Sequence, residues 1–306
     1  MGRYKCMAVY GLLVLAILFS SGCKSNTRVQ QEDMLLKVGL MPAVDSAPVL
    51  LAEKNGYFKE LGLNVELEIY NNAQNRQSAL QAQSIDGAMT DLIAVATNVD
   101  SGFDIKATTM TNGVFPVLSR KGSEDKESIK VGMMEVSVSN FLIDEWLGGI
   151  YTIEKVFINE IPARLAAIES GQLDMGLFPE PVASMGVLNG LEKNVYNTED
   201  PYCPDVMVFT GKAIKEKEKA VELFHKAYNM AVAEININEQ LARDILMEKM
   251  TNLEPGVRDL MVLPRYTKAS LPDNRYIEKI IEWTSGVLHK DLKVDAEDLV
   301  ERKFAE

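Results

Sequence analysis

The sequence predicts an α/β fold made of two similar lobes with a ligand cleft between them. One pattern occurs twice, in residues 76–91 and 164–179, and each copy reads as an amphipathic helix, a polar turn and a short apolar strand. Residues 37–41 (KVGLM) are echoed by residues 130–134 (KVGMM). Strands and helices also alternate along most of the chain, which is typical of a three-layer α/β arrangement. The matching positions of the longer repeat are Arg76 and Arg164, Ala79 and Ala167, Leu80 and Ile168, Ile85 and Leu173, and Asp86 and Asp174.

The first lobe is expected to contain four strands and three helices. Pro48 suits a first helical turn, where its missing N–H costs little, and Gly56 suits the end of that helix. Val65, Leu67 and Ile69 alternate with polar residues, as in a half-buried strand. The expected elements are a strand at 37–41, a helix at 48–55, a strand at 64–70, a helix at 71–83, a strand at 87–90, a helix at 91–99 and a strand at 105–110.

The pattern restarts after a charged turn at 121–130, which predicts a second lobe. Residues 114–119 and 205–210 read as extended segments that cross between the lobes and form a hinge. We therefore assign 37–116 and 207–306 to lobe 1 and 117–206 to lobe 2. The expected elements of lobe 2 are a strand at 130–134, a helix at 137–148, a strand at 156–158, a helix at 162–170 and a strand at 176–178. A helical tail follows, with helices at 212–237, 239–250, 257–262 and 274–288.

The N-terminus reads as an export signal. Arg3 and Lys5 precede an apolar stretch at 7–19, which is short for a membrane span. The sequence Ser20-Ser21-Gly22-Cys23 resembles a bacterial lipobox, so we expect residues 1–22 to be removed and Cys23 to be lipidated. Residues 23–36 would then tether the protein to the outer face of the cytoplasmic membrane. An ordinary signal peptide cleaved nearby is the alternative.

Composition excludes several function classes. The 306-residue chain has a formal net charge of −12 and no basic cluster, which argues against nucleic-acid binding. Once Cys6 is removed and Cys23 acylated, Cys203 alone remains, so neither a disulfide nor a cysteine-rich metal site is expected. The only histidines, His225 and His289, lie in helix-like stretches and read as packing or surface residues. We expect no metal and no cofactor.

The strongest single motif carries a family resemblance. Residues 45–63 (DSAPVLLAEKNGYFKELGL), with the strand before them, resemble the opening of periplasmic binding proteins for nitrate, sulfonates and thiamine pyrimidine precursors. The pieces GQLD at 171–174 and FPEP at 178–181 resemble later signatures of the same family. The resemblance runs from residue 37 to the C-terminus. It implies the type II periplasmic-binding-protein fold and delivery of a small solute to the permease and ATPase of an ABC importer, by a protein that we expect to be a monomer.

An enzyme is the less favoured class. Relatives of this fold that make a pyrimidine use a cysteine-rich motif and an active histidine, and this chain has neither. A lipoprotein that senses a solute and signals to a membrane receptor stays open, because the sequence does not separate sensing from transport.

Candidate ligand-binding residues follow from the expected strand ends, since ligands of open α/β sheets lie beyond the carboxyl ends of the strands. Several of these residues could instead only cap helices, as Asn72 and Asp91 would at the helices that follow them. The candidates are Met41, Asp45, Ser46, Asn72, Asp91, Asn112, Glu135, Ser137, Ser139, Phe178, Glu180 and Tyr202.

The charges of these loops suggest a ligand class. They supply Asp45, Asp91, Glu135 and Glu180 but only Arg76 as a cation. Carboxylates suit amine donors, which favours an amine-bearing heterocycle such as a thiamine pyrimidine precursor. Pyrimidine-binding members, however, usually carry a Trp near position 41 and a His near position 46, which this chain lacks. Ser137 and Ser139 at a helix start could instead hold an anion, so a sulfonate or taurine binder is the alternative.

Overall fold

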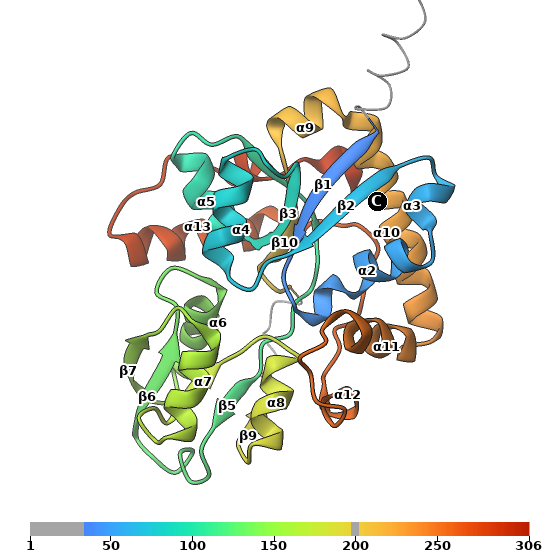
Figure 1. Cartoon of the computed structure of the whole chain (residues 1–306). Coiled ribbons are helices and arrows are strands. Elements are labelled where there is room, and N and C mark those ends of the chain that lie inside the picture. The colour runs from blue at the N-terminus through green and yellow to red at the C-terminus, as the bar shows by residue number, and fades with distance from the viewer. Residues whose placement is uncertain (1–33, 197–201, 306) are drawn as a thin grey trace, which may run out of the picture.

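Two five-stranded sheets form the centres of two lobes in the computed structural model, which describes residues 34–196 and 202–305 (Figure 1). The first sheet has the order β2-β1-β3-β10-β4 and the second the order β7-β6-β8-β5-β9. The strands of the first are β1 (Leu35–Leu40), β2 (Asn64–Ile69), β3 (Gly87–Asp91), β4 (Ile105–Met110) and β10 (Asp205–Thr210). Those of the second are β5 (Val117–Ser119), β6 (Ser128–Met133), β7 (Thr152–Phe157), β8 (Met175–Leu177) and β9 (Glu192–Asn194). The predicted two-lobed α/β fold is confirmed.

Helices cover both faces of the first sheet, because its strands bury side chains on both faces. Along β10, Met207 and Phe209 join one apolar cluster with α2 and α10, whereas Val206 and Val208 join another with α5 and α13. The helices of lobe 1 are α2 (Ala47–Lys54), α3 (Tyr57–Glu60), α4 (Ala73–Gln81) and α5 (Leu92–Asp100). The helical tail adds α9 (Gly211–Glu216), α10 (Glu218–Ile237), α11 (Gln240–Lys249), α12 (Val257–Leu260), α13 (Asn274–Leu288) and α14 (Ala296–Leu299).

Lobe 2 is smaller and repeats the pattern of lobe 1 with α6 (Val138–Leu147), α7 (Ile161–Glu169) and α8 (Val182–Leu188). In both lobes, the aspartate of the repeat ties the turn after the repeated helix to the first strand. Asp86 Oδ2 accepts a hydrogen bond from the Lys37 backbone N–H, and Asp174 Oδ2 accepts one from Lys130, each at 2.9 Å. The repeat in sequence is therefore a repeat in structure.

Glycine in the first strand of each lobe makes room for this unit. A Cβ added to Gly39 would lie 2.9 Å from Ile85 Cδ1, and one added to Gly132 would lie 2.5 Å from Leu173 Cδ1. The two apolar residues occupy the same position in the repeat. Each packs directly onto the strand, which only a residue without a side chain allows.

The structure corrects several predicted boundaries. β7 begins at Thr152 rather than 156, and α8, β9 and α14 were not predicted. The expected helix 212–237 is broken between α9 and α10 at Lys217, whose ammonium bonds Asp86 and the Leu35 carbonyl. β10 already pairs with β3 at Asp205, two residues before the expected lobe boundary at 207. The predicted signal peptide and Cys23 lie outside the described residues.

The lobes are connected by residues 111–116 and by 195–204, of which 197–201 are outside the described residues. The first connection belongs to no strand and turns at Asn112, whose φ is 59°, so up to the start of β5 it is a linker rather than the predicted crossing strand. Glu180 fixes it in place: its N–H donates to the Val114 carbonyl (2.9 Å), and its own carbonyl accepts from Val44 N–H (3.0 Å).

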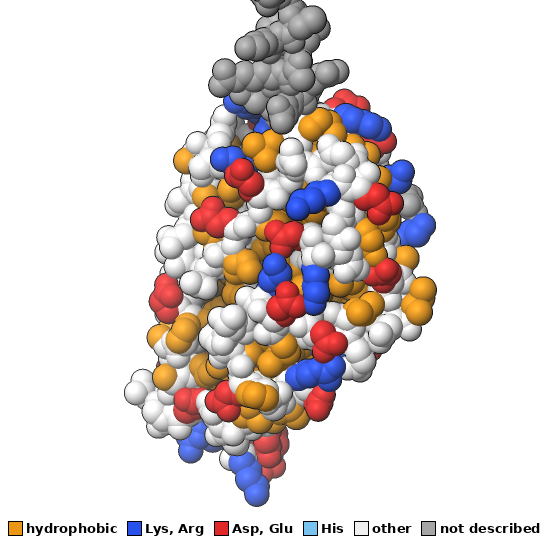
Figure 2. All heavy atoms as spheres, turned by 45° about the vertical axis from the view of Figure 1, so that its right-hand side comes forward, with side chains coloured by type: hydrophobic (Ala, Val, Ile, Leu, Met, Phe, Trp, Pro, Cys, Tyr) orange, Lys and Arg blue, Asp and Glu red, His pale blue; other side chains and the backbone are white. Residues whose placement is uncertain are grey.

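Neither sign of charge dominates the face of the molecule in Figure 2, where acidic and basic side chains are interspersed. No helix in the described part of the chain is long and apolar enough to cross a membrane.

Candidate functional site

A cavity of about 870 Å³ lies between the two lobes. It is bordered by residues just beyond the carboxyl ends of β1, β3, β6 and β8 and by the first turns of α4 and α7. This is the edge of the sheets at which ligands of open α/β folds bind. We call it the interlobe cavity. Of the predicted site residues, it brings together Met41, Asp45, Asp91, Ser137 and Ser139.

Arg164 is the buried cation that lobe 2 contributes to the interlobe cavity. Its side chain is 2 % exposed, and one guanidinium nitrogen donates to the Ile158 carbonyl at 3.1 Å. Its Nε has no partner, and within residues 34–196 and 202–305 it forms no ion pair with a carboxylate. Its guanidinium carbon lies 5.1 Å from the ring centroid of Phe178. Burial lowers the pKa of Arg164 to about 10.

Arg76 is the matching cation of lobe 1, at the same position of the sequence repeat. It is 5 % exposed and donates to Thr90 Oγ1 at 3.0 Å. Burial lowers its pKa, while the nearby carboxylates of Asp91, Asp205 and Asp45 act in the opposite direction. Arg76 is therefore partly balanced in charge, which Arg164 is not.

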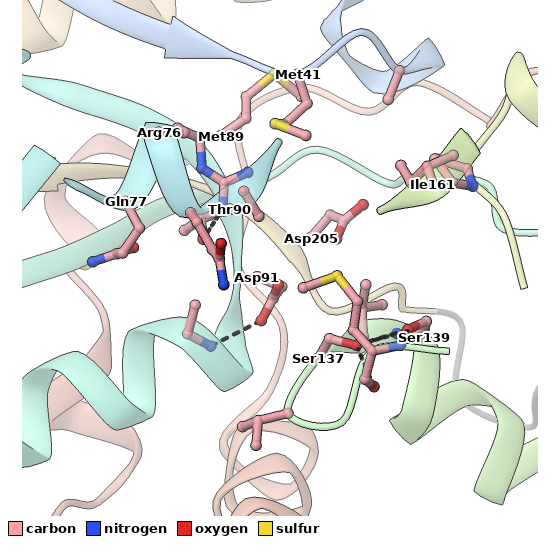
Figure 3. A pocket seen from close by; sticks show the side chains of 18 of the residues that line it. Met41, Arg76, Gln77, Met89, Thr90, Asp91, Ser137, Ser139, Ile161 and Asp205 are labelled. Atoms are coloured by element: carbon pink, nitrogen blue, oxygen red, sulfur yellow. Dashed lines mark hydrogen bonds between the residues drawn. The ribbon is translucent and has the colours of Figure 1, made fainter. Parts of the chain in front are cut away.

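Three carboxylates of lobe 1 also border the interlobe cavity, of which Asp45 and Asp205 are buried and Asp91 is half-buried. Asp45 Oδ2 accepts from Thr111 Oγ1 at 2.7 Å, while its Oδ1 has no partner among the described residues. Asp91 caps α5 by accepting from the Ala94 N–H at 2.8 Å. Asp205 is the cross-strand neighbour of Asp91 in the β10–β3 ladder. Arg76, Asp91 and Asp205 face the same space, with Ser137 and Ser139 across it (Figure 3).

The low-dielectric surroundings raise the pKa of each of these carboxyl groups. Burial raises the pKa of Asp45 to about 6, against the lowering effect of the Thr111 hydrogen bond. Burial, with the charges of Asp45 and Asp91, raises the pKa of Asp205 well above its usual range. Burial also raises the pKa of Asp91. A ligand group that donates hydrogen bonds would favour the ionised forms.

The first turn of α6 also borders the interlobe cavity from lobe 2. Ser137 caps this helix, its Oγ accepting from the Ser139 N–H at 3.2 Å, and the two hydroxyl oxygens lie 2.7 Å apart. Ser139 Oγ also accepts from the Met134 N–H at 3.0 Å, which ties the end of β6 to the helix. The positive end of the α6 dipole thus points toward the interlobe cavity.

The remaining predicted residues do not line the interlobe cavity, and the structure shows why for each. Glu180 is fully buried: its Oε1 lies 2.7 Å from Lys193 Nζ and accepts from the Val262 N–H, and its Oε2 accepts from Ser184 Oγ. Its internal bonds occupy both oxygens. Glu180 follows a strand as expected, but its side chain joins lobe 2 to the tail and does not line the interlobe cavity.

Phe178 and Tyr202, the two aromatic residues among the candidates, do not line the interlobe cavity. Phe178 is buried in the core of lobe 2 beneath the Arg164 guanidinium. Tyr202 packs on Tyr276, with ring centroids 5.3 Å apart, beside a second cavity. Packing inside lobe 2 and against α13 therefore keeps the two rings out of the interlobe cavity.

The other four serve local structure. Ser46 donates to the Ala43 carbonyl at 2.7 Å, and Asn112 donates to Thr267 Oγ1 at 3.0 Å. Asn72 caps α4 by accepting from the Asn75 N–H and borders a small neighbouring cavity. Glu135 is solvent-exposed, and its carbonyl accepts from Asn140. The capping alternative holds for Asn72, and capping and cavity lining coexist at Asp91.

Sequence reasoning missed Arg164 and Asp205, and it named Arg76 only as the cation that the candidate loops supply. The signal for the arginines was present, since both begin the repeated segment and the repeat was read only as a sign of two lobes. No sequence signal marked Asp205, because its place follows from pairing with β3. Other residues of the cavity wall, outside the candidate set, are Gln74, Gln77, Met89, Thr90, Phe115, Met134, Val136, Ile161 and Leu177.

The chain resembles known proteins both in sequence and in structure. The model of the NMT1-like family matches residues 29–247, well over half of the chain. The chain belongs to the NMT1-like family. No curated protein matches it. The family assignment confirms the resemblance inferred from residues 45–63.

Solved structures with this fold include transport proteins of three bacteria. The ligand-binding component of an ABC-type import system from Staphylococcus aureus, solved with zinc bound, has a TM-score of 0.74 at 18% identity and covers 89% of this chain and 97% of its own. The periplasmic aliphatic sulphonate-binding protein SsuA of Escherichia coli has a TM-score of 0.64 at 16% identity, covering 83% and 92%. The periplasmic nitrate-binding protein NrtA of Synechocystis PCC 6803 has a TM-score of 0.60 at 15% identity, covering 71% and 66%.

These likenesses confirm the periplasmic-binding-protein fold for this member of the NMT1-like family. The family and the structures named above are of solute-binding transport proteins rather than enzymes, as the sequence predicted. No group of three or more His, Cys, Asp or Glu that could hold a metal ion occurs in the described part of this chain.

Proposed function

We propose that the protein is the extracytoplasmic solute-binding component of an ABC importer and that its solute is a small molecule with an acidic group. The observation that carries this proposal is Arg164, a buried cation that faces the interlobe cavity without a carboxylate partner in residues 34–196 and 202–305. An unpaired buried charge is costly, and an anionic ligand group would offset that cost.

The surroundings of Arg164 suit an acid. A guanidinium can donate two parallel hydrogen bonds to a carboxylate, sulfonate or phosphate. The first turn of α6, with Ser137 and Ser139, adds a positive dipole end on the same lobe. An acid held between the lobes would therefore gain contacts from a side chain and from a helix.

This proposal differs from the amine-bearing heterocycle that the loop charges favoured. Glu180, one of the expected amine acceptors, is occupied inside the protein. A heterocycle without an acidic group would leave Arg164 unpaired. The alternative named from the sequence, a sulfonate or taurine binder, fits this cation better.

Closure of two lobes gives the mechanism. Arg76 and Arg164 approach the same cavity from opposite lobes, so a solute that contacts both stabilises the closed form through its higher affinity for that form. We further propose that the protein acts as a monomer and that a lipid on Cys23 holds it near the permease, which raises the local concentration of the loaded form. Detection of solute uptake that depends on this protein would separate transport from the sensing alternative.

Calorimetric titration with nitrate, ethanesulfonate, propionate, taurine and an aminopyrimidine tests the proposal. We expect at least one acid to bind and Arg164→Gln to weaken it by about 10- to 100-fold, since hydrogen bonds to charged groups contribute about 1.5–3 kcal/mol. Arg120→Gln, which removes an exposed arginine of the same lobe outside the cavity, is the matched control and should bind as the parent does. Binding of the aminopyrimidine with no response to any acid would overturn the proposal.

A further inference from the structure

The two walls of the interlobe cavity carry opposite charge. Lobe 2 presents Arg164 and the first turn of α6, and none of its described carboxylates borders the cavity. Lobe 1 presents Arg76 together with Asp45, Asp91 and Asp205. Three carboxylates exceed what one arginine balances, so this wall is formally negative.

Two of these carboxylates lack the partners that buried carboxylates normally have. Asp45 is 3 % exposed, and its Oδ1 has no hydrogen bond among the described residues. Asp205 is 8 % exposed and lies opposite another carboxylate, Asp91, in the antiparallel ladder. Like charges at such a position destabilise a sheet. Charge repulsion between cross-strand neighbours would be relieved by a donor placed in the cavity.

A purely structural role accounts for only one of these three carboxylates in full. Asp91 has one, because it caps α5. Asp45 bonds Thr111 through only one of its oxygens. Asp205 has a side chain that neither caps a helix nor joins an ion pair in the part of the chain that the structure describes. Balancing Arg76 needs one ionised carboxylate rather than three.

We propose that the solute is dipolar: its acidic group bonds Arg164 of lobe 2, and an amine or other N–H donor bonds Asp45 and Asp205 of lobe 1. The acid half of this arrangement rests on the proposed function, and the amine half is the new inference. Such a solute would satisfy the unpaired Asp45 Oδ1 and the unpaired Arg164 Nε together. Only the closed form brings Arg164 and the two carboxylates to one molecule. A simple anion would bond Arg164 and leave the carboxylates of lobe 1 without a ligand.

Pairs of acids that differ only by an amine test this inference on the full-length protein. The pairs are taurine with ethanesulfonate, β-alanine with propionate, and 4-aminobutyrate with butyrate, each titrated by calorimetry near pH 8. We expect the amine-bearing member of at least one pair to bind at least tenfold more tightly than its partner. Asp45→Asn should abolish that preference.

Each outcome separates the two proposals. Equal binding within every pair would overturn the dipolar solute and leave the acid-binding function standing. A preference that survives Asp45→Asn would overturn the placement of the amine at Asp45. Binding of none of the six acids would overturn the proposed function and the dipolar solute with it. Asp125→Asn, at an exposed carboxylate outside the cavity, is the matched control and should retain the preference.

Discussion

At the scale of single residues, the interlobe cavity keeps charges in unfavourable surroundings when it holds no solute. The carboxylate of Asp45 and the guanidinium of Arg164 each carry one polar atom without a partner among the described residues. Such atoms reduce the stability of a protein, and natural proteins retain them where a ligand satisfies them. Stability of the empty protein and affinity for the solute should therefore respond in opposite directions to substitutions here.

Asp45→Asn should stabilise the empty protein at pH 8. The pKa of Asp45 is raised to about 6, against roughly 4 in an unfolded chain, so the folded state retains this proton over a window in which the unfolded state loses it. The free energy of unfolding therefore falls as pH rises from about 4 to 6 and stays lowered above. Removing the charge should therefore raise the free energy of unfolding by about 3 kcal/mol at pH 8 and leave it unchanged at pH 4.

Chemical unfolding of the parent and the variant at both pH values measures this difference. Asp91, Asp205 and Arg76 face the same space, and the charge of Asp45 raises the pKa of Asp205, so the measured difference includes the release of Asp205 from this charge. Asparagine can still accept the hydrogen bond of Thr111. A variant no more stable than the parent at pH 8 would contradict the assigned cost of burying this carboxylate.

Among the predicted site residues, those that border the interlobe cavity follow the ends of strands, because the strand end determines where such a residue lies. Met41, Asp45, Asp91, Ser137 and Ser139 follow strands, and they do border the cavity. Glu180 also follows a strand, but the side chain turns toward Lys193 and the tail, and no local pattern encodes such a distant partner. Solute contact by any of these residues remains a prediction.

At the scale of elements, α6 has a role in both stability and recognition. Its first turn borders the interlobe cavity, and Ser139 Oγ also accepts the hydrogen bond of the Met134 N–H at the end of β6. The hydroxyl thereby fixes the helix start against the sheet. A helix dipole acts within its first turn, so its position relative to a bound acid determines how much it contributes.

Ser139→Ala should both destabilise the protein and weaken acid binding. The change leaves the half-buried Met134 N–H without its acceptor, which costs about 1 kcal/mol of unfolding free energy. We expect a lower melting temperature, and we expect acid affinity to fall because the α6 N-terminus loses its anchor. Ser170→Ala, after the end of α7, is the control. Unchanged affinity for an acid that the parent binds would exclude the α6 N-terminus from the site.

Long, periodic elements could be predicted, and short ones could not. The repeat and the alternation of Val65, Leu67 and Ile69 correctly indicated helices and strands, because their period reflects which face is buried. β9 has three residues and α8 has seven, too few for a period to appear. The break at Lys217 depends on its contact with Asp86, which lies 131 residues away in sequence.

At the scale of the whole molecule, the lobes touch on two sides of the linkers. On one side, Lys193 of lobe 2 donates to the Leu260 carbonyl in the tail. On the other, Trp283 of α13 donates from Nε1 to Asp144 Oδ2 of α6 at 3.0 Å, and its ring lies edge-on to Phe141 at 5.4 Å. These contacts oppose separation of the lobes, so they stabilise the arrangement that encloses the cavity.

Trp283→Phe should shift the protein toward an open form. The variant keeps an aromatic ring beside Phe141 but loses the bond to Asp144, which contributes about 0.5–1.5 kcal/mol. If only the closed form holds the solute at both ends, apparent affinity falls with the population of that form, by about two- to tenfold. Small-angle scattering should show a larger radius of gyration for the empty variant, and saturating solute should remove the difference. Trp146→Phe is the matched control, because Trp146 lies in the same interface region but its Nε1 has no partner among the described residues. Equal affinity and equal radius in the Trp283 variant would mean that this contact does not resist lobe opening.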